Sequence, residues 1–388
     1  MNLRLSILLS VLIATLSGCA GITHNLNPVN WFSSDIPAEI PAPLINFTPT
    51  VVITTRWHTT IGPNNAVAFA PALAIDSIYV ASAKGLLARL NPISGKPEWQ
   101  INAKMPFSAG VGASIDNEYI GTPRADLIAY DESGKIRWTS RLSSEIVGVP
   151  KMSGGTVVVR TEDGFIYGLD ADTGKQKWVY QHTLPTLMLR NQASVLITKG
   201  AIFAGYAGGK LVALSLDTGN VGWEAEVAIP RGASEIERVS DVTSMPVIDD
   251  NQVCAVAYQG RVACFDIHSG NLIWAKQISS TAGLVMDDNN IYVSDDDGDI
   301  VAFDKTTGTS VWKQTQLHAR HLTAPCRIGD YLAVGDIQGY VHLLALNDGH
   351  FVGRTATDGT AIISPPQEHN NSLIVQTAKG NVYALSLP

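Results

Sequence analysis

Acidic and histidine side chains gather at two places where they could bind a metal ion. Four of the five residues from Asp295 to Asp299 are Asp, the side chain that calcium loops use. An EF-hand loop would need a further acid where Val293 stands, and a turn of similar form recurs as Glu162-Asp163-Gly164. His318 and His321 could share a ligand, but a zinc site needs more than two such groups. We interpret both places as surface turns and expect no metal site.

Motifs of nucleophilic and phosphate chemistry are incomplete or absent in the sequence. The segment from Gly205 to Lys210 resembles a phosphate loop, but its spacing is short, and Leu211 stands where Ser or Thr is required. The sequence has neither a Gly-x-Ser-x-Gly elbow nor a His-Glu-x-x-His motif. We therefore expect no catalytic residue and no cofactor, and a binding protein rather than an enzyme.

The cysteines point to two kinds of chemistry. Cys19 ends the segment Leu16-Ser17-Gly18-Cys19, after a basic start and an apolar run of about a dozen residues. This pattern resembles a lipobox, in which cleavage leaves Cys19 as a lipid-carrying N-terminus; the alternative is an ordinary signal peptide with a chance cysteine. Cys254 and Cys264 lie on neighbouring predicted strands and could form a disulfide, whereas a register slip of one residue would put them on opposite faces. The sequence leaves that pairing open.

The ends of the chain and its charge restrict where it works. We predict a lipoprotein signal peptide at residues 1–18, a lipidated, proline-rich tether at 19–47 and a folded domain at 48–388. Ala20 follows the lipobox in place of the Asp that favours retention at the inner membrane, so we expect the outer membrane. Without the signal peptide, 26 basic and 35 acidic side chains remain. This acidic balance argues against nucleic acid as a partner and against electrostatic adhesion to anionic lipid.

A short motif that ends in Trp recurs about every 40 residues, the length of a four-stranded propeller blade. One copy reads Asp170-Ala-Asp-Thr-Gly-Lys-Gln-Lys-Trp178, and a seventh copy, Asn347 to Gly353, has lost its Trp. The recurring residues are Trp57, Trp99, Trp138, Trp178, Trp223, Trp274 and Trp312. Because they recur from blade to blade, we interpret them as structural, each docked between blades over a Gly turn, rather than as an aromatic binding surface.

Strands with alternating apolar residues and Gly turns precede each motif. The segment from Ile291 to Phe303, with its turn at Gly298, is one example, and no segment has a sustained helical period. The last copy ends after a third strand, Val382 to Leu387, and a matching fourth strand lies at Thr50 to Trp57. We therefore predict an all-β fold, an eight-bladed β-propeller of four-stranded antiparallel blades whose ring is closed by an N-terminal strand.

The repeat and the organisation of the whole chain resemble a known family. The pattern Ala-x-Asp-x-x-Thr-Gly-x-x-x-Trp is similar to that of pyrroloquinoline quinone (PQQ) dehydrogenase propellers. Together with the lipobox and tether, it resembles the BamB family of outer-membrane assembly lipoproteins. The resemblance implies a non-catalytic scaffold, lipid-anchored at the periplasmic face of the outer membrane in the β-barrel assembly (BAM) complex. It would bind the POTRA domains of BamA, contact unfolded barrel clients and aid their folding and insertion.

The alternative is a periplasmic PQQ-like quinoprotein or another ligand-binding propeller. The quinoprotein enzymes carry adjacent cysteines at the cofactor, whereas this chain has none. That difference argues against the enzymatic alternative.

Two segments interrupt the repeat and are candidates for partner binding. One places large apolar residues in a loop before the fourth blade, and the other stretches the interval from Trp223 to Trp274 to 51 residues. By the family resemblance, the residues on the surface that binds BamA are Leu187, Leu189, Arg190 and Asp241.

Features of the same segments leave other interpretations open. Thr243 stands where the family has a second acid, which weakens the charge of the second loop. From the residues alone, Leu187 and Leu189 could belong to an inner strand, and Arg238 could simply pair with Asp241. An exposed Asp241 would mainly orient a basic partner.

Overall fold

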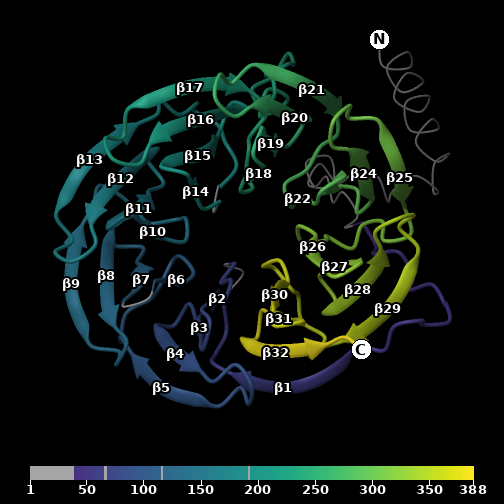
Figure 1. Ribbon diagram of the computed structural model, residues 1–388, viewed down its shortest axis with the longest axis horizontal. Coiled ribbons are helices and arrows are strands. Elements are labelled where there is room, and N and C mark those ends of the chain that lie inside the picture. The colour runs from purple at the N-terminus through teal and green to yellow at the C-terminus, as the bar shows by residue number, and fades with distance from the viewer. Residues whose placement is uncertain (1–38, 65–67, 115–116, 191–192) are drawn as a thin grey trace, which may run out of the picture. The chain divides into compact units, whose positions relative to one another are not determined.

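The computed structural model describes residues 39–64, 68–114, 117–190 and 193–388, so Cys19, the signal peptide and most of the predicted tether lie outside the described residues. Pro41–Pro388 forms one compact unit. Within the described ranges, the elements are 32 strands in eight four-stranded antiparallel sheets. The sheets stand as blades around a central opening (Figure 1). The prediction of an eight-bladed β-propeller is confirmed.

The first seven blades follow the chain, each from its inner to its outer strand (Figure 1). Blades 1 to 4 contain β2 (Ala72–Leu73), β3 (Ile78–Ala81), β4 (Leu86–Leu90) and β5 (Pro97–Asn102); β6 (Gly112–Ala113), β7 (Asn117–Gly121), β8 (Asp126–Asp131) and β9 (Ile136–Arg141); β10 (Lys151–Ser153), β11 (Thr156–Arg160), β12 (Phe165–Asp170) and β13 (Gln176–Gln181); and β14 (Leu196–Thr198), β15 (Ala201–Tyr206), β16 (Lys210–Ser215) and β17 (Val221–Glu226).

Blades 5 to 7 contain β18 (Val247–Ile248), β19 (Gln252–Val256), β20 (Arg261–Asp266) and β21 (Leu272–Gln277); β22 (Gly283–Met286), β23 (Asn290–Ser294), β24 (Ile300–Asp304) and β25 (Ser310–Gln314); and β26 (Cys326–Ile328), β27 (Tyr331–Gly335), β28 (Tyr340–Ala345) and β29 (Phe351–Ala356). Blade 8 joins β30 (Gln367–His369), β31 (Ser372–Gln376) and β32 (Asn381–Ser386) to β1 (Thr54–Thr60), so it combines the two ends of the domain.

The burial of each strand follows from its place in the blade. All five residues of β11 are buried, because neighbouring blades pack on both faces of the middle strands. The outer strand β13 buries only its central Trp178 and leaves most other positions exposed. The core is therefore a ring of apolar layers between blades rather than one central cluster.

Each blade tryptophan joins its blade to the next one along the ring. Trp178 of blade 3 lies on Gly219 in a turn of blade 4, and its indole N–H donates to the carbonyl of Leu216 at 2.8 Å. Gly219 has a φ of +70°, and a Cβ atom there would lie 2.5 Å from Cε3 of the indole. The other pairs are Trp57–Gly95, Trp99–Gly134, Trp138–Gly174, Trp223–Gly270, Trp274–Gly308 and Trp312–Gly349. Only glycine combines the left-handed backbone with room for the ring.

The ring closes through the pairing of β1 with β32, as the sequence predicts. The closing strand begins at Thr54 rather than Thr50, because the N–H groups of Thr50 and Val51 instead bind the carbonyl of Val352 on blade 7. Gly353 stands at the register position where the other blades carry Trp, and a Cβ atom there would lie 2.8 Å from the carbonyl oxygen of Val51. The incoming chain thus occupies the place of the lost Trp.

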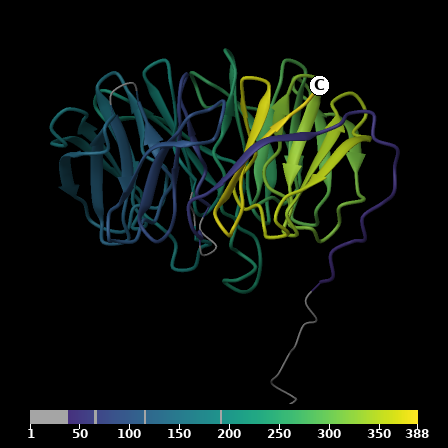
Figure 2. The same ribbon diagram turned by 90° about the horizontal axis from the view of Figure 1, so that it is seen from below.

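The segment from Ala42 to Ile53, which we call the strap, runs along blade 7 (Figure 2). The Arg320 guanidinium donates to the carbonyl of Ala42 at 2.8 Å, and that of Arg354 donates to the carbonyl of Ile45 at 3.0 Å. Phe47 stacks on Phe351 with ring centroids 5.6 Å apart. The last residues of the segment that we assigned to the tether therefore lie on the propeller.

A buried charged cluster in blade 7 holds these two arginines. Asp336 accepts hydrogen bonds from Arg320 at 2.7 Å and from His342 Nε2 at 2.9 Å, and all three side chains are almost fully buried. Arg354 donates to Nδ1 of His342, so the ring proton sits on Nε2. Burial lowers the pKa of His342, in keeping with a neutral imidazole between the arginine and the carboxylate.

The two central cysteines of blade 5 lie in register. Cys254 on β19 is directly opposite Cys264 on β20, with their Cα atoms 4.1 Å apart, and a disulfide joins them. Both side chains are buried beside Trp274, the register partner of Cys264. The bond thus crosslinks the two middle strands of the blade in its core.

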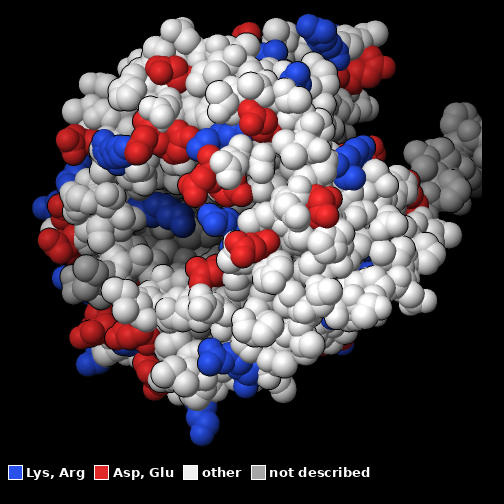
Figure 3. Space-filling view, turned by 45° about the vertical axis from the view of Figure 1, so that its right-hand side comes forward, with Lys and Arg blue, Asp and Glu red and all other residues white. Residues whose placement is uncertain are grey.

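Side chains of both charges are interspersed around the central hollow on the face in Figure 3, and the chain carries a net charge of −8. Within the described ranges, no helix is long and apolar enough to cross a membrane.

Alanine should reduce the unfolding free energy more at a turn glycine that contacts a tryptophan than at one that does not. Gly200→Ala and Gly219→Ala both introduce a side chain at positive φ in blade 4, but only Gly219 faces an indole, whereas nothing lies within 4 Å of a Cβ atom at Gly200. We expect Gly200→Ala to cost about 1–2 kcal/mol of unfolding free energy and Gly219→Ala a further 1–3 kcal/mol, roughly, from overpacking. Urea unfolding checks this, and equal losses would contradict it.

Candidate partner-binding site

The two segments that interrupt the repeat lie on adjacent blades and on one face of the ring. The β13–β14 loop precedes blade 4, and the β17–β18 loop precedes blade 5. Antiparallel order places the end of each outer strand and the start of the next inner strand on the same side, which we call the loop face. The β11–β12 and β15–β16 hairpins open on this face too. The sequence prediction that both loops can form one patch fits this arrangement.

Asp241 fastens the two loops together from inside. Its Oδ2 accepts the backbone N–H of Leu189 at 2.6 Å, and its Oδ1 accepts that of Gly208 at 2.9 Å. The side chain is 1% exposed, and the structure gives it these backbone partners rather than Arg238. This differs from the sequence interpretation of Asp241 as an exposed acid, because the β13–β14 loop folds over the carboxylate. Asp241 is a positioning residue, and it shapes the surface without forming it.

The other three predicted residues lie along the β13–β14 loop with different exposures. Leu187 is 43% exposed, and Leu189 is half-buried against the central cavity. These residues belong to no strand, which excludes the inner-strand alternative. Arg190 is exposed and forms an ion pair with Glu145 at 2.5 Å. Burial raises the pKa of Glu145 while the Arg190 guanidinium opposes that shift.

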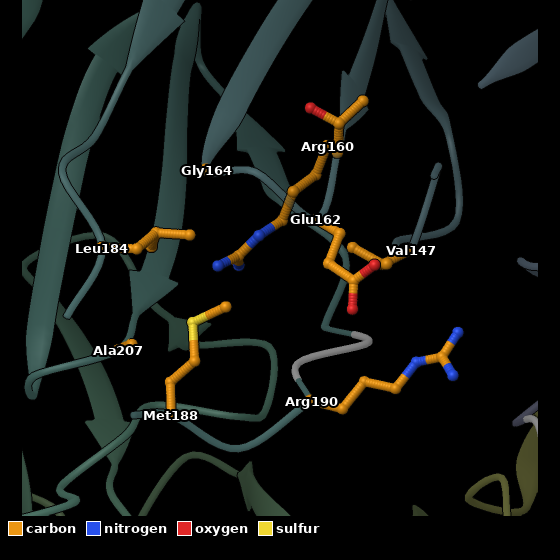
Figure 4. A pocket seen from close by; sticks show the side chains of 9 residues that line it. Val147, Arg160, Glu162, Gly164, Leu184, Met188, Arg190 and Ala207 are labelled. Atoms are coloured by element: carbon orange, nitrogen blue, oxygen red, sulfur yellow. The ribbon is translucent and has the colours of Figure 1, made fainter. Parts of the chain in front are cut away.

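A small cavity of about 20 Å³ lies beneath the same loop (Figure 4). Leu184 and Met188 line it from the loop, and Arg160 and Glu162 line it from blade 3. Arg160 is buried and donates to the carbonyl of Gly205 at 2.6 Å. The cavity is large enough only for about one water molecule. We therefore interpret it as a small packing defect between the loop and blade 3 and not as a ligand pocket.

Arg160 also contributes to an aromatic stack that supports the start of the loop. Its guanidinium lies 4.5 Å from the ring centre of Tyr206, and His182 stacks on the same ring at 4.2 Å. Burial lowers the pKa of His182, which favours a neutral ring in the stack. Because the stack holds the start of the loop in one conformation, the loop loses less conformational entropy when a partner binds.

The β17–β18 loop presents apolar residues of its own. Ile229, Ile236 and Met245 are 50%, 71% and 40% exposed. Glu237 accepts the backbone N–H groups of Ala233 and Ser234, which closes the loop tip into a local turn. The loop is thus shaped by its own hydrogen bonds, and its apolar side chains remain available to a partner.

Thr243 has a structural partner of its own. Its hydroxyl donates to the carbonyl of Thr281 on the next blade at 3.1 Å. An ionised acid at this position could not donate that hydrogen bond. The hydroxyl of Thr243 therefore couples the β17–β18 loop to the loop that leads into blade 6.

The two other places singled out in the sequence serve local structure. The Asp295 carboxylate accepts the N–H of Asp299 within one hairpin, and Asp299 pairs with Lys313 at 2.6 Å. Among the described residues, no cluster of three His, Cys, Asp or Glu side chains is arranged to hold a metal. The Gly-rich turn at Gly208 does bind an anion through its N–H, but the anion is the Asp241 carboxylate and not phosphate.

Sequence reasoning missed three contributors to the surface. These are Glu145, which holds Arg190, Met188, which lines the cavity, and the N–H of Gly208, which holds Asp241. Glu145 and Arg190 are separated by 45 residues, and their pairing leaves no periodic trace in the sequence. The Gly208-Gly209 pair can be recognised in the sequence, but the sequence does not show that Gly208 binds the Asp241 carboxylate.

Comparisons with known proteins agree on one family. Residues 83–314 match the family described as "Outer membrane protein assembly factor BamB". The chain is 43% identical to the protein of that name from Nitrosomonas eutropha over 98% of this chain and 94% of the relative. It is 40% identical to that of Bordetella pertussis, with 98% and 96% covered. The crystal structure of BamB from Moraxella catarrhalis superposes with a TM-score of 0.80 at 32% identity, covering 86% of this chain and all of that one.

More distant structures share the fold alone. Quinohemoprotein alcohol dehydrogenase from Comamonas testosteroni superposes with a TM-score of 0.72 at 14% identity, covering 86% of this chain and 76% of the dehydrogenase. At this identity, the likeness carries no argument about cofactor or activity.

Removal of the Asp241 carboxylate should loosen the loops without unfolding the ring. We expect Asp241→Ala to cost about 1–3 kcal/mol, because two buried N–H groups lose their acceptor. Hydrogen exchange at the amides of Leu189 and Gly208 should accelerate in this variant. Glu235→Ala, an exposed acid of the same loop, is the control and should change neither. Unchanged protection of both amides in Asp241→Ala would contradict the positioning role.

Proposed function

Because the chain belongs to the family of outer membrane protein assembly factor BamB, we propose that it is a non-catalytic lipoprotein scaffold of the BAM complex. In this role it binds the periplasmic POTRA domains of a BamA protein and aids the folding and insertion of β-barrel proteins. The observation that carries the proposal is the fastening of two repeat-breaking loops into one surface by the buried Asp241.

The composition of this surface fits a protein partner. Leu187, Ile236 and Met245 supply exposed apolar area, and Arg190 adds a guanidinium that is already oriented by Glu145. Apolar anchors beside an arginine are typical of the residues that dominate binding energy at interfaces. The affinity comes from these side chains, while Asp241 and the Arg160 stack keep the surface in its bound shape.

The course of the strap supports a lipid anchor on the same side as the partner. Ala42 is bound to His318 and Arg320 in the loop between β25 and β26, which belongs to the loop face. In Figure 2 the strap leaves the ring on the side of the long loops. The chain between Cys19 and Pro41 can span at most about 75 Å. A lipid on Cys19 would therefore keep the loop face within that distance of the membrane.

The combined change Leu189→Ala with Arg190→Ala should weaken partner binding while leaving the propeller folded. We expect a loss of about 2–4 kcal/mol, since a half-buried leucine of the loop and an exposed guanidinium are removed together. Calorimetric titration with the purified periplasmic domains of the cognate BamA protein measures it. Leu272→Ala with Lys276→Ala removes a similar exposed pair from the outer strand of blade 5 and serves as the control. Wild-type affinity in the first variant would move the partner site elsewhere.

Substitution of the lipobox cysteine should separate the protein from the membrane. We expect Cys19→Ser to abolish lipid attachment, and the protein should then appear in the periplasm or as an uncleaved precursor. Fractionation of cells and metabolic labelling with a fatty acid report the two effects. A variant that remains in the outer-membrane fraction at normal levels would rule out the lipid anchor at Cys19.

A further inference from the structure

A channel with a volume of about 1040 Å³ lies at the centre of the ring. Inner-strand residues of seven blades contribute to its wall, and blade 4 contributes Ala193 and Ser194, which precede its inner strand. Most of the lining residues are Ala, Val, Leu, Pro and Gly, and several Ser and Thr hydroxyls interrupt them. This volume and this largely apolar wall are typical of cavities that hold small organic molecules.

Four charged residues line the cavity, and three of them are engaged elsewhere. Arg190 pairs with Glu145, as described above. Arg327 donates to the carbonyl of Gly329 in its own hairpin, and Glu368 accepts the N–H of Asn371 in its own hairpin. Lys151 is the exception, because no described residue forms an ion pair or a side-chain hydrogen bond with it.

The strand register shows how isolated this ammonium group is. Lys151 is paired with Val158, which stands in register with Gly168 and Trp178 across blade 3. The residues at the equivalent inner position of the other blades are Ala72, Gly112, Leu196, Val247, Val285, Cys326 and Gln367. Lys151 is therefore the only charged residue among these eight equivalent inner-strand positions.

Lys151 is half-buried and no acid of the described residues pairs with it, so its ammonium group is less well solvated than one on the open surface. Burial lowers the pKa of Lys151, and desolvation is the only cause. A carboxylate from a ligand would restore the missing charge partner in a medium where ion pairing is stronger than in water. The remaining wall offers contact to an apolar group. Basic side chains lie deep in the hollow in Figure 3, below a rim with several acids.

We propose that the central cavity binds a small amphipathic monocarboxylate, with its carboxylate at Lys151 and its apolar part along the wall of Ala, Val and Leu residues. Lys151 supplies one positive charge for one carboxylate, and the acidic surface of the chain disfavours polyanions. Lys151 belongs to the ring itself, but Leu189, Arg190 and Met245 of the two loops also line the cavity, so the cavity shares these residues with the proposed partner surface. Titration of the protein alone tests the cavity without that partner.

Calorimetric titration with octanoate, with 1-octanol as the uncharged counterpart, tests the site in the full-length protein. We expect saturable one-site binding of octanoate to the wild type and at least tenfold weaker binding of 1-octanol. Lys151→Met should weaken octanoate binding by about tenfold or more, because the ligand charge loses its buried partner. Lys151→Arg keeps the charge and should bind within about threefold of the wild type.

Two controls separate the site from general effects. Lys135→Met removes an exposed lysine from a turn of blade 2 and should leave octanoate binding unchanged. Lys151→Met replaces an unpaired, desolvated cation with an apolar side chain of similar length, so its melting temperature should be at least that of the wild type. The proposal is overturned if the wild type shows no saturable octanoate binding, or if Lys151→Met binds octanoate as tightly as the wild type.

Discussion

The contact between an indole ring and a glycine of the following blade is the constraint on which the rest of the ring depends. The ring leaves no room for a Cβ atom, and its N–H needs a carbonyl of the same turn, as at Trp178, Gly219 and Leu216. In blade 2, whose turn is one residue shorter, Trp99 still donates to Glu132, but the contact is looser, because a Cβ atom at Gly134 would lie 3.3 Å from the indole. Seven junctions are built in this way, which is why Trp and Gly recur together in the sequence.

The eighth junction shows what replaces this contact when a blade is assembled from both chain ends. Blade 8 has no turn that leads into its outer strand, so an indole on blade 7 would have nothing to cover. Gly353 stands there instead, and the strap fills the space with its own backbone. The cluster of Arg320, Asp336, His342 and Arg354 then fixes the strap through its carbonyls. Buried charges are costly, and here Asp336 pairs with Arg320.

The sequence predicts the periodic part of this structure and little of the irregular part. The Trp and Gly spacing predicts the eight blades, and the alternation of residues predicts the strands and the closing pair. The register of Cys254 with Cys264 could not be decided, because a shift of one residue reverses the faces. The role of Asp241 was hidden for another reason. Its partners Leu189 and Gly208 lie 52 and 33 residues away, in loops that have no repeat pattern. The sequence therefore predicted an exposed acid that orients a partner, whereas Asp241 is a buried acceptor that holds two loops together.

The pairing of β1 with β32 also sets the order in which the molecule can be completed. Thr54 and Ser386 are joined by a hydrogen bond across 332 residues, so the first strand of the domain pairs with the last one to be synthesised. Blades 1 to 7 consist of strands that are neighbours in the chain and can form as each one emerges. Until the final strand arrives, the ring has an open edge and a vacant slot. Before that pairing forms, each end of the domain carries a strand without its neighbour, an edge that could pair with another chain.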